Sequence, residues 1–245
     1  RDDPPKIDGM ESIYITTSRC RYVLGLPQYT ITSLCVTNLL ILQCRLHALR
    51  NTNHAPWKPL LLFLHGFPEN SYSWRNQLKY FRDTHTVVAL DMRGFGDSDA
   101  PRSTSDYSMD SLCLDVVATV RACGYETCVL IGHDWGGMVA WNVSANFPKM
   151  ITGLVTVCSP HPRAYSEKEC FTLAQAARSS YFMLFATPWL PEIYLRHSQG
   201  KEIRKMMLLP PMGVVTPQSL TEQDVEFYVS ALLRPYRLTA GLNYY

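Results

Sequence analysis

Residues 127–141 read T-C-V-L-I-G-H-D-W-G-G-M-V-A-W, and the rest of the chain is organised around this stretch. The apolar residues 128–131 predict a buried strand, and the residues that follow Gly137 show a helical pattern. A polar residue among glycines, at a turn from a strand into a helix, is typical of a nucleophile elbow. The small neighbours permit the sharp turn, and Asp134 occupies the position of the nucleophile, where many such elbows have Ser.

Strands and helices are predicted to alternate between residues 59 and 160. Buried strands and amphipathic helices are indicated in turn at 59–64, 74–81, 86–90, 108–124 and 153–158. This order predicts an α/β fold in which helices flank both faces of a mostly parallel sheet. After residue 163 the pattern becomes helical and rich in aromatic residues, which suits a lid over the carboxyl ends of the strands.

These patterns divide the chain into three expected parts. They are a divergent N-terminal segment, residues 1–43, an α/β core, residues 44–162, and a helical lid, residues 163–245. Residues 22–44 carry no charged side chain, but their most apolar part is shorter than the roughly 18–20 residues that span a bilayer. Two alternatives stay open for this stretch: a buried or disordered segment, and a weak association with a membrane.

The composition excludes several classes of function. The net charge is +2 over 245 residues, so nothing indicates a nucleic-acid partner. None of the eight cysteines forms a C-x-x-C pair, which favours reduced core cysteines over disulfides or zinc. We therefore expect no metal and no cofactor, and an intracellular protein that is either cytoplasmic or associated with a membrane such as the endoplasmic reticulum.

An aspartate at the elbow indicates a two-step reaction. A carboxylate with an ordinary pKa of about 4 is ionised at neutral pH and can attack a saturated carbon without the help of a base. The attack leaves an alkyl ester on Asp134, and hydrolysis of that ester needs a general base and an oxyanion hole. The expected donors of the oxyanion hole are the backbone N–H groups of Phe67 and Trp135.

Several motifs resemble those of epoxide hydrolases with the α/β-hydrolase fold. Four of them occur in the family's order, at residues 65–69 (HGFPE), 91–101 (DMRGFGDSDAP), 132–137 (GHDWGG) and 159–162 (SPHP). Each motif is a modest signal, but four in the right order are strong. The resemblance covers about residues 44–245, and it implies opening of an epoxide to a diol through an Asp134 alkyl ester. The implied reactants are a small lipophilic epoxide and water.

The lid extends this resemblance. Residues 181–188 resemble the family segment whose first residue, here Tyr181, polarises the epoxide oxygen, and residues 242–245 resemble the segment with the second such tyrosine, here Tyr245. The resemblance also implies a substrate pocket lined by His65, Pro68 and Trp135. Packing or loop support, without a direct role in the reaction, is expected for Asp91, Arg93, Asp97, His133, Tyr228 and Tyr244.

The sequence also departs from the family. After the lid, family members add strands that carry an orienting acid and a general-base histidine, and none of the seven histidines here lies in such a region. The expected fold therefore lacks the last strands, and we expect a fragment or an alternative gene product with incomplete turnover. The alternatives are a haloalkane dehalogenase-like hydrolase and a non-catalytic truncated isoform or pseudoenzyme. A serine esterase is excluded, because no G-x-S-x-G motif occurs.

Overall fold

The computed structural model describes residues 5–19, 42–166, 172–210, 213–214, 216 and 219–245. Within these ranges the chain forms a six-stranded sheet with the spatial order β1-β2-β4-β3-β5-β6. The strands are β1 (Met10–Arg19), β2 (Leu42–Asn51), β3 (Leu60–Leu64), β4 (Thr86–Leu90), β5 (Cys128–His133) and β6 (Ile151–Val157).

The centre of the sheet is parallel. Strands β4, β3, β5 and β6 run in one direction, and the antiparallel pair β1 and β2 is joined to the β4 edge. Every residue of β3 and β4 is buried, as is typical of parallel strands that are covered on both faces. In the described part of the chain β6 forms the other edge, where Val155 and Val157 are exposed.

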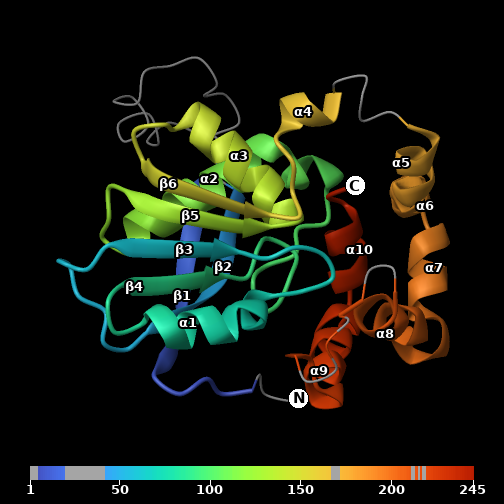
Figure 1. Cartoon of the computed structure of the whole chain (residues 1–245), viewed down its shortest axis with the longest axis horizontal. Coiled ribbons are helices and arrows are strands. Elements are labelled where there is room, and N and C mark those ends of the chain that lie inside the picture. Colours follow the sequence, from blue (N-terminus) through green and yellow to red (C-terminus); the bar gives the residue numbers. More distant parts are fainter. Residues whose placement is uncertain (1–4, 20–41, 167–171, 211–212, 215, 217–218) are drawn as a thin grey trace.

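Helices cover both faces of the sheet (Figure 1). Helices α2 (Met109–Ala122) and α3 (Trp135–Asn146) share one apolar cluster with Leu62 of β3. The 3-10 helix η2 (Ser71–Trp74) and helix α1 (Arg75–Phe81) share a second cluster with Phe63. Successive residues of a strand point to opposite faces, so these two neighbours contribute to the two separate clusters.

The helices that follow β6 in the sequence lie at the carboxyl ends of the parallel strands (Figure 1). They are α4 (Pro162–Ser166), α5 (Leu173–Arg178), α6 (Ser180–Ala186), α7 (Leu190–Arg196), η5 (His197–Gly200), α8 (Lys201–Leu208), α9 (Glu222–Leu233) and α10 (Arg237–Leu242). The 3-10 helix η3 (Thr104–Tyr107) precedes α2.

Helix α9 is tied to the core by its first turn. Thr221 and Asp224 form a reciprocal capping box, in which each side chain accepts a hydrogen bond from the backbone N–H of the other residue. The carboxylate of Asp224 also accepts a hydrogen bond from the Tyr72 hydroxyl at 2.9 Å and lies 3.2 Å from the Arg75 guanidinium. This connection holds the lid against η2 and α1.

The α/β fold predicted between residues 59 and 160 is confirmed, and the N-terminal part differs from expectation. Residues 1–43 were expected only as a divergent segment, but β1 lies within them, pairs with β2 over its whole length and buries Ile15 and Thr17. Residues 20–41, which hold most of the candidate membrane stretch, lie outside the described residues. Among the helices that are described, none has the length and apolarity needed to cross a bilayer.

Candidate active site

Asp134 lies at a strained turn between β5 and α3. Its φ is +52° and its ψ is −120°, a conformation that a residue with a side chain adopts at a cost of about 1–3 kcal/mol. Close backbone contacts hold the turn in place. A Cβ on Gly132 would lie 2.4 Å from the carbonyl oxygen of Gly136, and a Cβ on Gly136 would lie 2.4 Å from that of Leu64. The glycines of the motif are therefore required by packing against the end of β3.

The loop after β3 supplies a backbone donor to this carboxylate. The N–H of Phe67 donates to Oδ1 of Asp134 at 2.9 Å, and the N–H of Trp135 also bonds to the carboxyl group. Burial raises the pKa of Asp134, and these two N–H groups partly offset that effect. The backbone groups that the sequence analysis selected for an oxyanion hole thus both reach the nucleophile candidate.

A partly buried ion pair stands beside the carboxylate. Nδ1 of His133 lies 3.3 Å from Oε2 of Glu69, which belongs to the loop after β3. Burial is the largest single influence and opposes the charge on His133, but the hydrogen bond that its ring donates to Glu69, together with the negative charges of Glu69 and Asp134, raises the pKa of the imidazole. The same bond lowers the pKa of Glu69 against the effect of its own burial. Sequence reasoning missed this pair, although Glu69 closes the HGFPE motif and His133 precedes the nucleophile candidate.

His65 has a different position from the one expected of a pocket residue. Its ring has no exposed surface, its Nδ1 bonds to the carbonyl oxygen of Gly66 at 2.8 Å, and its Nε2 accepts the N–H of Met92 at 2.9 Å. Burial lowers the pKa of the ring, in keeping with a neutral imidazole that donates at one nitrogen and accepts at the other. His65 therefore supports the loop from behind and does not line a substrate pocket. Pro68 follows the cis peptide bond that begins at Phe67.

The two lid tyrosines meet above the elbow. The rings of Tyr181 on α6 and Tyr245 after α10 are 6.4 Å apart, and the Tyr245 ring lies 5.8 Å from Phe67 and 5.2 Å from Trp135. Burial raises the pKa of Tyr245, and the nearby Asp134 carboxylate adds to the shift. Its phenol is therefore protonated at neutral pH and is available as a hydrogen-bond donor.

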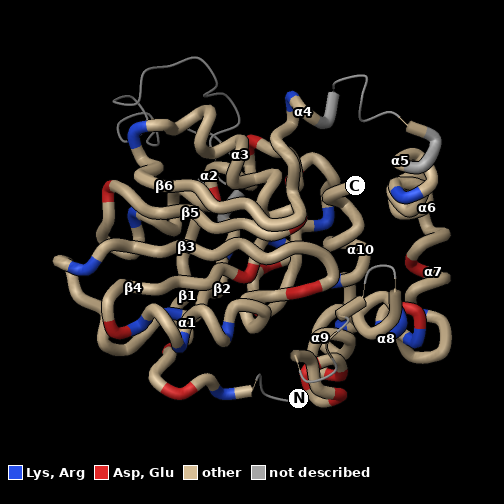
Figure 2. Tube along the Cα trace, in the orientation of Figure 1, with Lys and Arg blue, Asp and Glu red and all other residues tan. Residues whose placement is uncertain are grey.

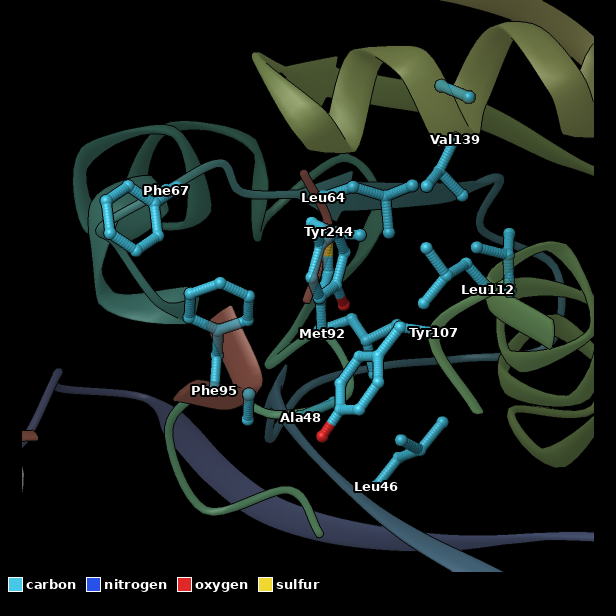
Figure 3. Close-up of a cluster of buried hydrophobic side chains, with 14 of the residues drawn as sticks. Leu46, Ala48, Leu64, Phe67, Met92, Phe95, Tyr107, Leu112, Val139 and Tyr244 are labelled. Atoms are coloured by element: carbon cyan, nitrogen blue, oxygen red, sulfur yellow. The ribbon is translucent and has the colours of Figure 1, made fainter. Parts of the chain in front are cut away.

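The neighbouring tyrosines are structural, as expected. Tyr244 points into the core toward Met92 and Tyr107 (Figure 3), and its hydroxyl donates to the carbonyl oxygen of Arg93 at 2.7 Å. Tyr228 is buried on α9, where its hydroxyl lies 3.4 Å from the Arg75 guanidinium.

The loop after β4 is held by three ion pairs, in keeping with the loop support that was expected of Asp91, Arg93 and Asp97. Asp91 bonds to the ring of His47 at 2.7 Å, which keeps the pKa of the carboxyl well below its usual range even though burial opposes ionisation. The other two pairs are Arg93 with Asp115 and Asp97 with Arg234. Asp91 also accepts the backbone N–H groups of Ser71 and Asp97, so it links the two loops that flank the site.

A cavity of about 710 Å³ lies away from the elbow. It is bounded by residues 5–10, by the loop after β4 and by α9, and His47 and Arg234 are among its lining residues. Asp134 does not line it. In the ranges that the structure describes, no group of three or more His, Cys, Asp or Glu side chains could hold a metal ion. The groups gathered at the elbow are the Asp134 carboxylate, the N–H groups of Phe67 and Trp135, and the phenols of Tyr181 and Tyr245.

Comparisons with known proteins agree with this geometry. A family model described as the alpha/beta hydrolase fold matches residues 59–186, just over half of the chain. Human epoxide hydrolase 4 is 40% identical over 189 residues, which are 77% of this chain and 52% of the relative. The chain spans about half the length of the curated relatives it matches.

Solved structures of epoxide hydrolases resemble the chain as well. The enzyme VrEH1 from Vigna radiata has a TM-score of 0.67 and 30% identity, with 82% of this chain and 68% of that chain covered. The enzyme from Bacillus megaterium, solved with an inhibitor, has a TM-score of 0.73 and 28% identity over 82% and 68% of the two chains. The chain belongs to the α/β-hydrolase fold family and, within it, to the epoxide hydrolases.

Proposed function

We propose that this chain opens epoxides by nucleophilic attack of Asp134. The observation that carries the proposal is the hydrogen bond from the Phe67 N–H to Oδ1 of Asp134. This bond orients the carboxylate at the strained elbow toward a site that Tyr181 and Tyr245 of the lid cover. The oxygen held by the backbone becomes the carbonyl oxygen of the ester. The other oxygen forms the new bond to an epoxide carbon.

The lid tyrosines assist the opening of the ring. As the carbon–oxygen bond breaks, its electron pair moves to the epoxide oxygen, where Tyr181 and Tyr245 donate hydrogen bonds and a phenol supplies the proton. A tyrosine is protonated at neutral pH, so Tyr245 can donate to the epoxide oxygen, and burial, which raises its pKa, makes its phenol a weaker acid than that of a free tyrosine. The aromatic rings of Phe67 and Trp135 around it suit a lipophilic epoxide.

Release of the diol requires a second step, attack of water on the carbonyl carbon of the ester. The water must lose a proton to a base. All seven histidines lie in described ranges, and His133 is the one that adjoins Asp134, but its Nδ1 is bound to Glu69 and its raised pKa favours the protonated form, which does not accept a proton from water. We therefore expect the ester to form faster than it is hydrolysed in this chain.

Intact mass after incubation with styrene oxide tests the proposal. We expect a gain of one substrate mass per chain, with no gain in Asp134→Ala, and less than one equivalent of diol over the same period. Circular dichroism of both proteins shows that they are folded. A folded chain without adduct would contradict the proposed nucleophile and favour the non-catalytic alternative, and steady formation of many equivalents of diol would contradict the slow second step.

A haloalkane dehalogenase-like activity is the second candidate. The observation in its favour is the indole N–H of Trp135, which is buried beside the Tyr245 hydroxyl and could bind a departing halide. The two tyrosines favour the epoxide instead. Release of bromide from 1-bromobutane, measured beside the styrene oxide adduct, discriminates the two: we expect no bromide.

The cellular location stays a prediction. We expect the protein in the cytoplasm or at an intracellular membrane such as the endoplasmic reticulum, with a weak membrane contact through residues 22–44. Deletion of residues 20–41 tests that contact, because a bound fraction carried by this stretch would be lost in membrane fractionation.

A further inference from the structure

Helix α7 exposes large apolar and aromatic side chains beside the charged residues Glu192 and Arg196. Pro191 and Leu195 are buried against the rest of the lid, while Leu190, Ile193 and Tyr194 point outward at helical spacing with exposed fractions of 51%, 69% and 45%. Scattered single apolar side chains are normal on a protein surface, but a contiguous group of large exposed ones marks an interaction site. The outer side of α7 is such a group.

The exposed surface continues onto the neighbouring helix. Met183 on α6 and Trp189 at the start of α7 are exposed by 78% and 79%, and α6 and α7 are in contact. Trp189 has a φ of +64°, which a bulky residue adopts at an energetic cost, and this conformation accompanies the outward position of its indole. We call Met183, Trp189, Leu190, Ile193 and Tyr194 the outer lid face.

Positive charge accompanies the outer lid face. Residues 173–209 contain five Lys or Arg and two Glu, a net charge of +3, whereas the whole chain carries +2, so that all other residues together carry −1. Figure 2 shows an uncharged stretch of the trace through α6, followed by an acidic position in α7, with basic positions in α5 and α8. The basic residues are Arg178, Arg196, Lys201, Arg204 and Lys205. Arg204 pairs with Glu226 and Lys205 with Glu202, so among the described residues Arg178, Arg196 and Lys201 are the ones of this set that form no ion pair with a carboxylate.

We propose that the outer lid face rests in the interfacial region of a lipid bilayer that contains anionic headgroups. An apolar helix surface with Trp and flanked by Lys and Arg is the pattern of helices that lie in the plane of a membrane surface. Tyr181 on the inner side of α6 faces the candidate site, so a lid held in this way would place the site next to a reservoir of lipophilic molecules. The proposal concerns binding to lipid and does not depend on catalysis.

The charge favours lipid over a second copy of this chain. A symmetric dimer through the outer lid face would bring two segments of +3 together, and like charges at an interface oppose association. Anionic headgroups have the complementary sign. Binding to them should weaken as the salt concentration rises, because surface charges are screened.

Co-sedimentation with phosphatidylcholine vesicles containing about one third phosphatidylserine tests the proposal. We expect the 245-residue chain to bind and the double variant Trp189→Ser, Ile193→Ser to lose about tenfold or more in the bound-to-free ratio. The matched control is Trp57→Ser. It removes an 83% exposed indole from the surface of the α/β part of the chain, outside the lid, and should leave binding unchanged. Unfolding does not confound the comparison, since all three side chains are exposed and circular dichroism monitors the fold.

Three results would overturn the proposal. The first is no binding by the wild-type chain, and the second is equal binding by the double variant, which would place the contact elsewhere, for example in residues 22–44. The third is a dimer in light scattering that the double variant converts to a monomer, which would assign the outer lid face to a second copy. Quenching of tryptophan fluorescence by brominated lipid gives an independent readout: we expect it to fall in Trp189→Ser and to persist in Trp57→Ser.

Discussion

Substitution of Gly66 by Ala is the most direct perturbation of the candidate site. A Cβ at this position would lie 2.4 Å from the Cβ of Asp134 and 2.5 Å from its Oδ1, whereas carbon atoms in contact are about 3.5–4.0 Å apart. The two loops must therefore separate by roughly 1 Å. The φ of Gly66 lies outside the left-handed region, so the effect comes from contact with the nucleophile and not from backbone strain.

The expected magnitude follows from this displacement. A shift of about 1 Å stretches the 2.9 Å hydrogen bond from Phe67 to Asp134 beyond the range of a hydrogen bond. Misplacement of a reacting group by about 1 Å slows a reaction by about 100-fold, or about 2.7 kcal/mol in the barrier. We expect the rate of adduct formation with styrene oxide to fall by at least that factor.

The assay is a time course of intact mass at several styrene oxide concentrations. Gly153→Ala is the matched control, because it adds the same methyl group in β6, where the new Cβ would meet Val129 at an ordinary 3.4 Å, and its rate should stay near that of wild type. A folded Gly66→Ala chain that reacts within about threefold of wild type would refute the geometric argument.

Three further changes test other parts of the structure. Asp134→Asn should raise the melting temperature at neutral pH, because burial raises the pKa of this carboxyl and its ionisation then destabilises the folded state; the gain should shrink as the pH falls toward about 4. Arg93→Met should lower the free energy of unfolding in urea by about 3–5 kcal/mol, since it leaves the buried Asp115 without its guanidinium, and adding Asp115→Leu should restore most of the loss. Tyr245→Phe should slow adduct formation by about 10- to 100-fold with little change in melting temperature. Tyr244→Phe should instead lower the free energy of unfolding by about 1 kcal/mol, because it loses a buried hydrogen bond, and should react at the wild-type rate.

Local patterns predicted the parts of the fold that depend on neighbours in the sequence. The apolar runs of β3 and β4 are buried throughout, and the turn at Asp134 forms between glycines that admit close backbone contact. Strand β1 was not predicted, because the burial of an edge strand depends on the strand that pairs with it. Ile15 and Thr17 become buried only when residues 42–51 pair beside them.

The polar partners of the site depended on tertiary contacts. Glu69 meets His133 across 64 positions of sequence, and His47 meets Asp91 across 44. No local pattern specifies such pairs, because each depends on the register of two strands and on the packing of the loops that follow them. The same holds for His65, whose motif suggested a pocket but whose buried ring binds backbone on both sides.

The α/β alternation, the elbow with an aspartate in place of Ser, and the resemblance that marked Tyr181 and Tyr245 can all be read from the sequence alone. Short motifs and hydrophobic periodicity carry these features, and both act within a few residues. The folded structure was needed to show that the Phe67 N–H reaches Asp134, that the two tyrosines meet above it, and that α7 exposes large apolar side chains. Each of these three features depends on the relative positions of segments that are distant in the sequence. Those positions are fixed only when the sheet, the loops and the lid pack together.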